Sequence, residues 1–173
     1  PGQLNYASMG DGSSQHLGAE LFKSLARVDL THVPYRGSPA AAAALLAGEV
    51  SVYFVGESTP APHVKAGKLR ALGTTGKSRS DVYPDVPTIG EILPGYEMTI
   101  WFGIFAPAGL PDSIVRKLNT DFAKALEAKD VRTALAARGF NARSSSPEEF
   151  RALVERDQER YAALLNEAGI KPK

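Results

Sequence analysis

A short turn rich in glycine and serine is the part of this sequence best suited to chemistry. It runs from Ala7 to His16 and joins a strand-like run to a helix-like run. Such a turn places backbone N–H groups at the positive end of a helix dipole, where they bind a carboxylate or a phosphate without lysine or arginine. The hydroxyl groups of Ser8, Ser13 and Ser14 add donors. The turn therefore predicts an anion site. The alternative is a simple helix cap, since no known phosphate-binding fingerprint is present.

Two further turns follow predicted strands. Tyr35 to Ser38 again joins a strand to a helix, and Val55 to Glu57 follows the third strand. The carboxyl ends of parallel strands share one edge of a sheet, and ligands bind in the crevice there. Three turns at one edge favour an anion site more strongly than any one of them alone.

The histidines and the missing residue types argue against catalysis. His16 falls on a predicted helix, His32 on a strand and His63 near a proline-flanked helix, without the spacing of metal ligands, so capping or core hydrogen bonds are expected. The chain has no cysteine, which removes disulfides, thiolate metal sites and cysteine nucleophiles. It also has no nucleophile-elbow sequence. We expect no catalytic residues, no cofactor and no metal.

The elements that position these turns alternate between strand and helix. Strands are predicted at Leu4–Ser8, Leu30–Val33, Val50–Val55 and Leu69–Thr74. Helices begin at Ser13 or Ser14 and at Ser38-Pro39, where proline occupies the first helical position. Strands separated by helices of about ten residues indicate βαβ units and a largely parallel sheet, which places the fold in the α/β class.

The second half of the chain is mainly helical. Residues 75–98 are rich in proline and glycine and predict an irregular surface stretch, and Thr99–Phe105 predicts an aromatic strand. A capping box at Ser146 to Glu149 opens a long helix that ends near Gly169. These helices carry two apolar stripes, Ile114, Leu118, Phe122 and Leu126, then Phe150, Leu153, Leu164 and Leu165.

Length and charge limit the class of protein. At 173 residues, 43% hydrophobic and 23% charged, the chain fits one globular domain or one domain with part of another. The net charge of +1 is scattered, which makes nucleic acid and anionic membrane poor partners. The chain begins at Pro1 without an initiator methionine. We expect it to be cut from a longer protein, with any targeting signal in the missing part.

Several stretches, taken in order, resemble one family, the tripartite tricarboxylate transporter receptors, also called Bug receptors. They are Leu4-Asn5-Tyr6-Ala7-Ser8, His32-Val33-Pro34-Tyr35-Arg36-Gly37-Ser38, Pro62-His63-Val64-Lys65-Ala66-Gly67-Lys68-Leu69-Arg70-Ala71-Leu72, Pro84-Asp85-Val86-Pro87-Thr88, Trp101-Phe102-Gly103, Ala106-Pro107-Ala108-Gly109 and Ser146-Pro147-Glu148-Glu149-Phe150. The resemblance covers nearly the whole chain.

The resemblance implies a two-lobed, periplasmic binding protein-like (type II) fold with a small carboxylic acid in the cleft. Residues 1–98 would form the second lobe, and residues 99–173 would supply the crossover strand and the helices that return to the first lobe, most of which is absent. It also implies a receptor in the periplasm that passes its ligand to a membrane transporter or a signalling partner.

The resemblance also implies which positions face the ligand. They are Ser8, Gly10, Gly12, Ser13, Ser14 and His16 in the first turn, and Tyr35, Gly37 and Ser38 in the second. The third turn departs from the family pattern, since Val55-Gly56, followed by Glu57, replaces a polar pair such as Asp-Asn. This departure argues against an amino-acid ligand.

Two expectations remain open at this level. The alternative function is the effector-binding domain of a transcription regulator, which has the same two-lobed architecture; an upstream helix-turn-helix would favour it, whereas a signal peptide would favour the receptor. The apolar stripes of the C-terminal helices must also be covered. We expect them either to fold back on their own sheet or, preferably, to bury against a second copy.

Overall fold

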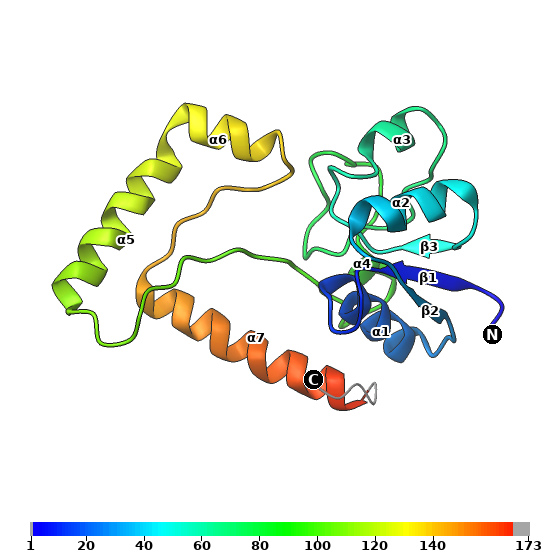
Figure 1. Cartoon of the computed structure of the whole chain (residues 1–173), viewed down its shortest axis with the longest axis horizontal. Helices are drawn as coiled ribbons and strands as arrows, with labels where there is room; N and C mark the ends of the chain where they lie inside the picture. Colours follow the sequence, from blue (N-terminus) through cyan, green and yellow to red (C-terminus); the bar gives the residue numbers. More distant parts are fainter. Residues whose placement is uncertain (1, 168–173) are drawn as a thin grey trace. The chain divides into compact units, whose positions relative to one another are not determined.

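The computed structural model describes residues 2–167, which form two compact units. The first comprises the described residues up to Ile100 together with those from Ala162, and the second is Trp101–Tyr161. Figure 1 shows their elements, and each unit is described by itself below. The predicted helix end at Gly169 lies outside the described residues.

A parallel three-stranded sheet organises the first unit. Its strands are β1 (Asn5–Ser8), β2 (Thr31–Pro34) and β3 (Val52–Tyr53), in the order β2-β1-β3. Ser8 pairs with Pro34, and Ala7 pairs with Tyr53. The three strands therefore end at one edge, and the predicted parallel α/β sheet is confirmed.

Helices α1 (Ser14–Ala26) and α2 (Ser38–Ala47) cover opposite faces of this sheet (Figure 1). Successive side chains of a strand point to opposite faces. Tyr6 accordingly packs with Ala19 on the α1 side. Ala7 packs on the α2 side, where the other buried residues are Ala41, Ala44 and Val50. The small alanines of α2 let its backbone lie close to the strands.

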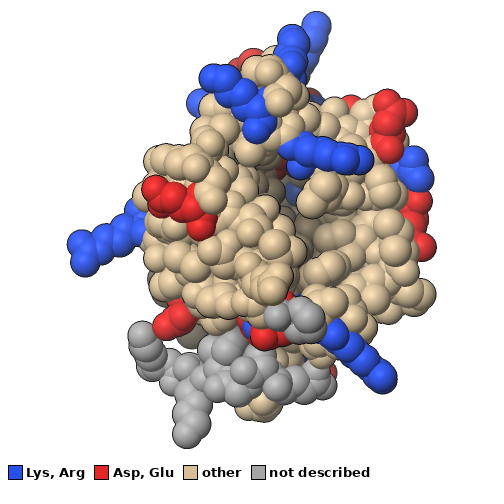
Figure 2. All heavy atoms as spheres, turned by 90° about the vertical axis from the view of Figure 1, so that its right-hand side faces the viewer, with Lys and Arg blue, Asp and Glu red and all other residues tan. Residues whose placement is uncertain are grey.

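The face shown in Figure 2 is largely uncharged. Acidic and basic side chains lie mainly around its rim, and several lysine and arginine side chains lie near one another at the top of the view.

Residues 75–98 do more than form an irregular surface, which corrects the prediction. Tyr96 and Met98 are buried, and the Tyr96 hydroxyl donates a 3.1 Å hydrogen bond to the carbonyl of Gly18 in α1. A Cβ at Gly18 would lie 3.4 Å from Met98 Cγ and from the Tyr96 hydroxyl, so this segment packs closely over α1. The segment is irregular in backbone but part of the core.

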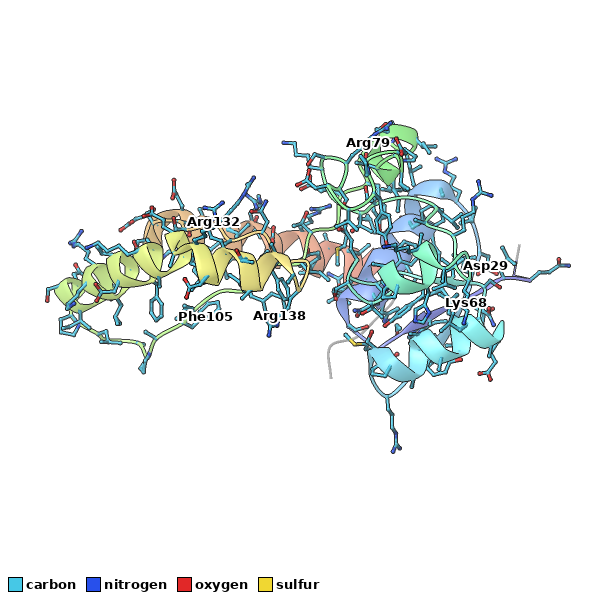
Figure 3. The ribbon with its side chains drawn as sticks, turned by 90° about the horizontal axis from the view of Figure 1, so that it is seen from above. Asp29, Lys68, Arg79, Phe105, Arg132 and Arg138 are labelled. Atoms are coloured by element: carbon cyan, nitrogen blue, oxygen red, sulfur yellow. The ribbon has the colours of Figure 1, made fainter. Side chains whose placement is uncertain are left out.

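Two short helices follow β3 along the chain, both within the first unit. They are α3 (Ala61–Lys65) and α4 (Ile89–Ile92). A capping box formed by Thr88 and Glu91 begins α4. Arg79 donates hydrogen bonds of 2.9 and 2.7 Å to the Glu91 carboxylate (Figure 3). This pair lowers the pKa of Glu91 to about 2.

Two predicted strands do not form. In the segment Leu69–Thr74, the pairing is a single bridge from Thr74 to Thr88. Thr99–Phe105 is extended but pairs with no strand among the described residues. A strand is stable only when a neighbour accepts its backbone hydrogen bonds, and the sequence pattern of a segment does not reveal whether that neighbour is present.

The second unit is built on α5 (Asp112–Glu127), α6 (Lys129–Ala136) and most of α7 (Pro147–Glu167). The predicted capping box at the start of α7 is confirmed. Ser146 Oγ accepts the backbone N–H of Glu149, and the Glu149 carboxylate accepts the backbone N–H of Ser146. Trp101 packs edge-on against Phe150, and its indole N–H donates a 2.6 Å hydrogen bond to Asp157. These contacts order the start of the extended segment.

Large apolar side chains remain exposed on the second unit. Phe102 is 78% exposed, Phe105 68% and Ile104 63%; Phe105 lies on the extended segment before α5 (Figure 3). The predicted stripe of α5 is exposed as well, at Ile114, Leu118 and Phe122. A patch of this kind usually marks an interface.

The exposed apolar residues predict that the 173-residue chain self-associates in solution. Each large side chain gains roughly 1.5–3 kcal/mol on full burial, so replacing Phe102 and Ile104 with serine should shift the chain toward monomer in sedimentation experiments at micromolar concentration. The matched control is Val82→Ser, because Val82 is also exposed but lies in the first unit. A wild-type chain that sediments as a monomer would contradict the prediction.

Candidate functional site

The turn after β1 is closed by hydrogen bonds from its own residues. Ser13 is the N-cap of α1: its Oγ accepts the N–H of His16 at 3.3 Å and donates to the carbonyl of Gly10 at 2.7 Å. Gly10 and Gly12 have φ angles of 115° and 74°, a region that side-chain-bearing residues rarely adopt. The glycines of this turn are therefore required by its backbone shape.

Three backbone N–H groups of the turn are already used inside it. Gly10 donates to Ser8 Oγ at 3.0 Å, Gly12 donates to His16 Nδ1 at 3.1 Å, and Ser13 donates to the Gly10 carbonyl at 3.2 Å. By contrast, the N–H groups of Ser14 and Gln15 have no hydrogen-bond partner among residues 2–167. These first two helical donors, at the positive end of α1, are the groups available to an anion.

Two histidine rings lie beneath the turn, between the sheet and α1. The His16 ring, on α1, stacks on the His32 ring, on β2, with centroids 4.0 Å apart and planes 10° apart. His32 stacks in turn on Tyr6, its partner across the β1–β2 pairing. His32 Nε2 is joined to Ser8 Oγ by a 2.5 Å hydrogen bond. Each ring thus contacts one part of the turn.

An acidic group completes this buried layer. Glu20 Oε1 accepts hydrogen bonds from the Tyr6 hydroxyl at 2.6 Å and from Lys23 at 2.7 Å. Burial raises the pKa of Glu20, but these two bonds outweigh it, and the pKa lies below the usual value. Glu20 is therefore ionised at neutral pH and matched by Lys23.

Burial lowers the pKa of both histidines. For His16 the nearby Glu20 and Asp11 oppose the effect of burial without cancelling it. For His32 the neighbouring His16 lowers the pKa further. Both rings are consequently neutral at pH 7. Since His16 Nδ1 accepts the Gly12 N–H, its proton lies on Nε2.

Asp11, His16 and His32 place their ligand atoms within 4.8 Å of one another, but the ring geometry does not suit a metal ion. A bound ion lies about 2.0–2.1 Å from each imidazole nitrogen and in the plane of each ring. Two rings stacked 10° from parallel direct their lone pairs along separate planes. The rings are built to stack and to accept or donate hydrogen bonds.

The second predicted turn lies at the same edge of the sheet. The N–H of Tyr35 donates to the Ser8 carbonyl at 2.9 Å, which fixes this turn beside the first. Gly37 has a φ of 95° and is the N-cap of α2. Ser38 Oγ accepts a 3.2 Å hydrogen bond from the Tyr53 hydroxyl. The hydroxyl group of Ser38 can still donate to a ligand.

The third predicted turn follows β3 at the same edge. Glu57 Oε2 accepts a 2.7 Å hydrogen bond from the Ser80 hydroxyl, so its charge meets a donor within the chain. Gly56 is exposed and open to solvent, and Val55 is half-buried. The three predicted turns are thus all at the carboxyl edge, where the parallel register places them.

Sequence reasoning placed neither His32 nor Asp11 in this site. His32 makes the core hydrogen bond expected of it, to Ser8, but the structure also stacks it on His16. Asp11 had no predicted role, and its Oδ1 lies 3.7 Å from His32 Nδ1. The one signal in the sequence was that His32 lies on a predicted strand that could pair with the strand carrying Ser8. Recognising it required the register of β1 against β2.

Comparison with known proteins identifies the family. The family model described as tripartite tricarboxylate transporter family receptor matches residues 1–170. The chain belongs to this family. It is 41% identical over 169 residues to a UPF0065 protein in the tcbD-tcbE intergenic region of Pseudomonas sp. (strain P51). That match covers 96% of this chain but 50% of the relative, so the chain spans about half the length of this curated relative.

Solved structures show the same fold. Rpa4515 of R. palustris, solved with adipate, is 34% identical with a TM-score of 0.85, covering 100% of this chain and 58% of that one. MatC from Rhodopseudomonas palustris, with bound malate, is 35% identical with a TM-score of 0.76, covering 95% and 57%. These matches confirm the expected periplasmic-binding-protein class of fold.

Family membership also bears on the class of function. The family consists of solute receptors and not of enzymes, as the sequence predicted. It favours the receptor over the transcription-regulator alternative. Among the described residues, no helix is both long and apolar enough to cross a membrane.

The capping role of Ser13 predicts a loss of stability on its replacement. Ser13→Ala removes both the cap of α1 and the bond to Gly10, and should lower the free energy of unfolding by about 1 kcal/mol, within a range of roughly 0.5–2. Ser13→Asp keeps a cap acceptor and should recover part of this loss. Urea denaturation measures both variants; equal stability of Ser13→Ala and wild type would rule out the cap.

Proposed function

We propose that this protein is a periplasmic receptor that binds a small carboxylic acid at the carboxyl edge of the β2-β1-β3 sheet. The carrying observation is the N-terminus of α1, where the N–H groups of Ser14 and Gln15 have no partner among the described residues. The bound adipate and malate of the two neighbouring structures support a carboxylate over a phosphate. The acid is delivered to the membrane components of a tripartite tricarboxylate transporter.

In this proposal, the first turn binds the carboxylate and the other two turns recognise the rest of the molecule. The hydroxyl of Ser14 donates a 3.3 Å hydrogen bond to Gln15 Oε1, and in this proposal it redirects that bond to the acid. The turn with Tyr35, Gly37 and Ser38 contributes neutral donors. The Glu57 carboxylate already accepts a hydrogen bond from Ser80, so this turn has less to offer an amino group on the ligand. An acid without an amino group therefore fits this edge best.

A negative charge introduced at the start of α1 should affect ligand affinity and fold stability in different directions. Ser14→Asp places a carboxylate at the proposed anion position, and two like charges near 4 Å repel by about 4 kcal/mol near a protein surface. In the full-length protein, the affinity for adipate should fall at least about tenfold, a change of 1.4 kcal/mol in binding free energy. Fold stability should hold or rise, because an acidic residue in the first turn complements the helix dipole.

The control for this experiment is Ser24→Asp, which adds the same charge to an exposed position on the same helix, more than two turns away. It should leave the affinity for adipate unchanged in calorimetry. If Ser14→Asp binds adipate as tightly as Ser24→Asp, the acid does not bind at the N-terminus of α1. Malate is the second probe, because it is the smaller of the two acids.

The 173-residue chain alone should bind these acids weakly or not at all. The neighbouring structures are longer, and this chain covers 57–58% of them; a two-lobed binding protein removes water from its ligand by using both lobes. A calorimetric titration of the chain with adipate and malate checks this expectation. Micromolar or tighter binding by the chain would contradict the expectation that it carries only part of the binding site.

A further inference from the structure

Each of the two stacked histidines is connected to one glycine of the ligand turn. His16 Nδ1 accepts the N–H of Gly12 at 3.1 Å. His32 Nε2 shares a 2.5 Å hydrogen bond with Ser8 Oγ, which in turn accepts the N–H of Gly10 at 3.0 Å. The two rings, stacked on each other, therefore fix the positions of both glycines that give the turn its shape.

We propose that His16 is a positioning residue that keeps this turn in its binding shape only while its ring is neutral, with the His32 ring stacked against it, so that uptake of one proton by His16 loosens the turn and weakens its hold on an anion. The inference rests on the proposed function for its consequence at the ligand. The coupling between the rings and the turn does not depend on which ligand binds.

The chemistry of imidazole gives the direction of the effect. A neutral ring has one nitrogen that accepts a hydrogen bond, whereas a protonated ring has two donors and no acceptor. Protonated His16 would turn an N–H toward the N–H of Gly12, and the bond that holds Gly12 would become a repulsion. A charge on one ring also opposes a charge on the other at a centroid distance of 4.0 Å.

Charged and titratable groups face the pair from every neighbouring element. From α1, Glu20 Oε1 lies 3.9 Å from His16 Nε2 and favours a proton, whereas Lys23 disfavours it. From the turn, Asp11 Oδ1 lies 3.7 Å from His32 Nδ1. From the sheet, Tyr6 stacks on His32. Burial outweighs the two carboxylates, so the pKa of each histidine stays below its ordinary value.

The sign of the pH dependence follows from these shifts. The unfolded chain takes up protons on its histidines at about pH 6.5, and the folded chain does so only at lower pH. Folding stability and turn order should therefore be complete above pH 6.5 and decline as the pH falls below it. The Glu20 carboxylate titrates lower, since its pKa lies below its ordinary value, so histidine loses its neutral form before Glu20 loses its charge.

The experiment is an NMR titration of the ligand-free chain from about pH 8 to pH 5, the range in which histidine changes charge. The amide signal of Gly12 should move with the same midpoint as the ring protons of His16. That midpoint should lie below 6.5. A Gly12 signal that stays constant while the His16 ring titrates would overturn the proposal.

Conservative variants separate positioning from simple packing. His16→Asn offers an amide oxygen near the place of Nδ1, accepts the Gly12 N–H and cannot gain a proton, so the Gly12 signal should become independent of pH. His16→Ala should leave Gly12 disordered at every pH. His63→Asn is the control, because His63 is the one other histidine of the chain and its removal should leave the titration of Gly12 unchanged.

A second variant can be used if His16→Asn does not fold. His16→Gln offers a longer amide that can also accept the Gly12 N–H and cannot gain a proton, so it should likewise flatten the titration of Gly12. If Gly12 still titrates in a folded His16→Asn or His16→Gln variant, another group controls the turn and the proposal is wrong.

An affinity measurement links the pair to the ligand. In the native protein, adipate affinity should fall several-fold more in wild type than in His16→Asn as the pH is lowered from about 7 to 5.5. Comparing variants at each pH cancels the ionisation of adipate itself. If no variant binds adipate at any pH, the proposed function fails while the amide titration still decides the role of the histidines.

Discussion

The structure depends on a layer of polar side chains buried between the sheet and α1. A polar group buried without a hydrogen bond is costly, and His16, Ser8 and Tyr6 are each nearly or fully buried. Each of them has a partner: Gly12 for His16, His32 for Ser8 and Glu20 for Tyr6. The hydrogen bonds of this layer hold α1 against the sheet. They also hold the turn that precedes α1.

The same layer determines which donors remain for a ligand. The glycine N–H groups were predicted to be anion donors, but they form hydrogen bonds within the turn. The hydroxyl groups of Ser8 and Ser13 also donate within the turn, to the carbonyl of Gly10. What remains is the start of α1, at Ser14 and Gln15. The turn acts as a rigid support, and the helix terminus supplies the charge-attracting groups.

Local patterns predicted the elements whose stability is local. The cap at Ser13, the helix start at Ser38 and the capping box at Ser146 all follow from a few neighbouring residues, and each is present. The strand predicted at Thr99–Phe105 is absent because its pairing depends on residues elsewhere. The stack of His16 on His32 also escaped prediction, because it depends on the β1–β2 register and on the rotation of α1 about its axis.

The central claim is that a carboxylate binds at the N-terminus of α1. The most direct test is a crystal structure of the native protein with adipate bound. The claim predicts carboxylate oxygens at about 2.7–3.2 Å from the backbone nitrogens of Ser14 and Gln15, with the turn and its histidine bonds unchanged. Adipate bound with both carboxylates away from these nitrogens would contradict it.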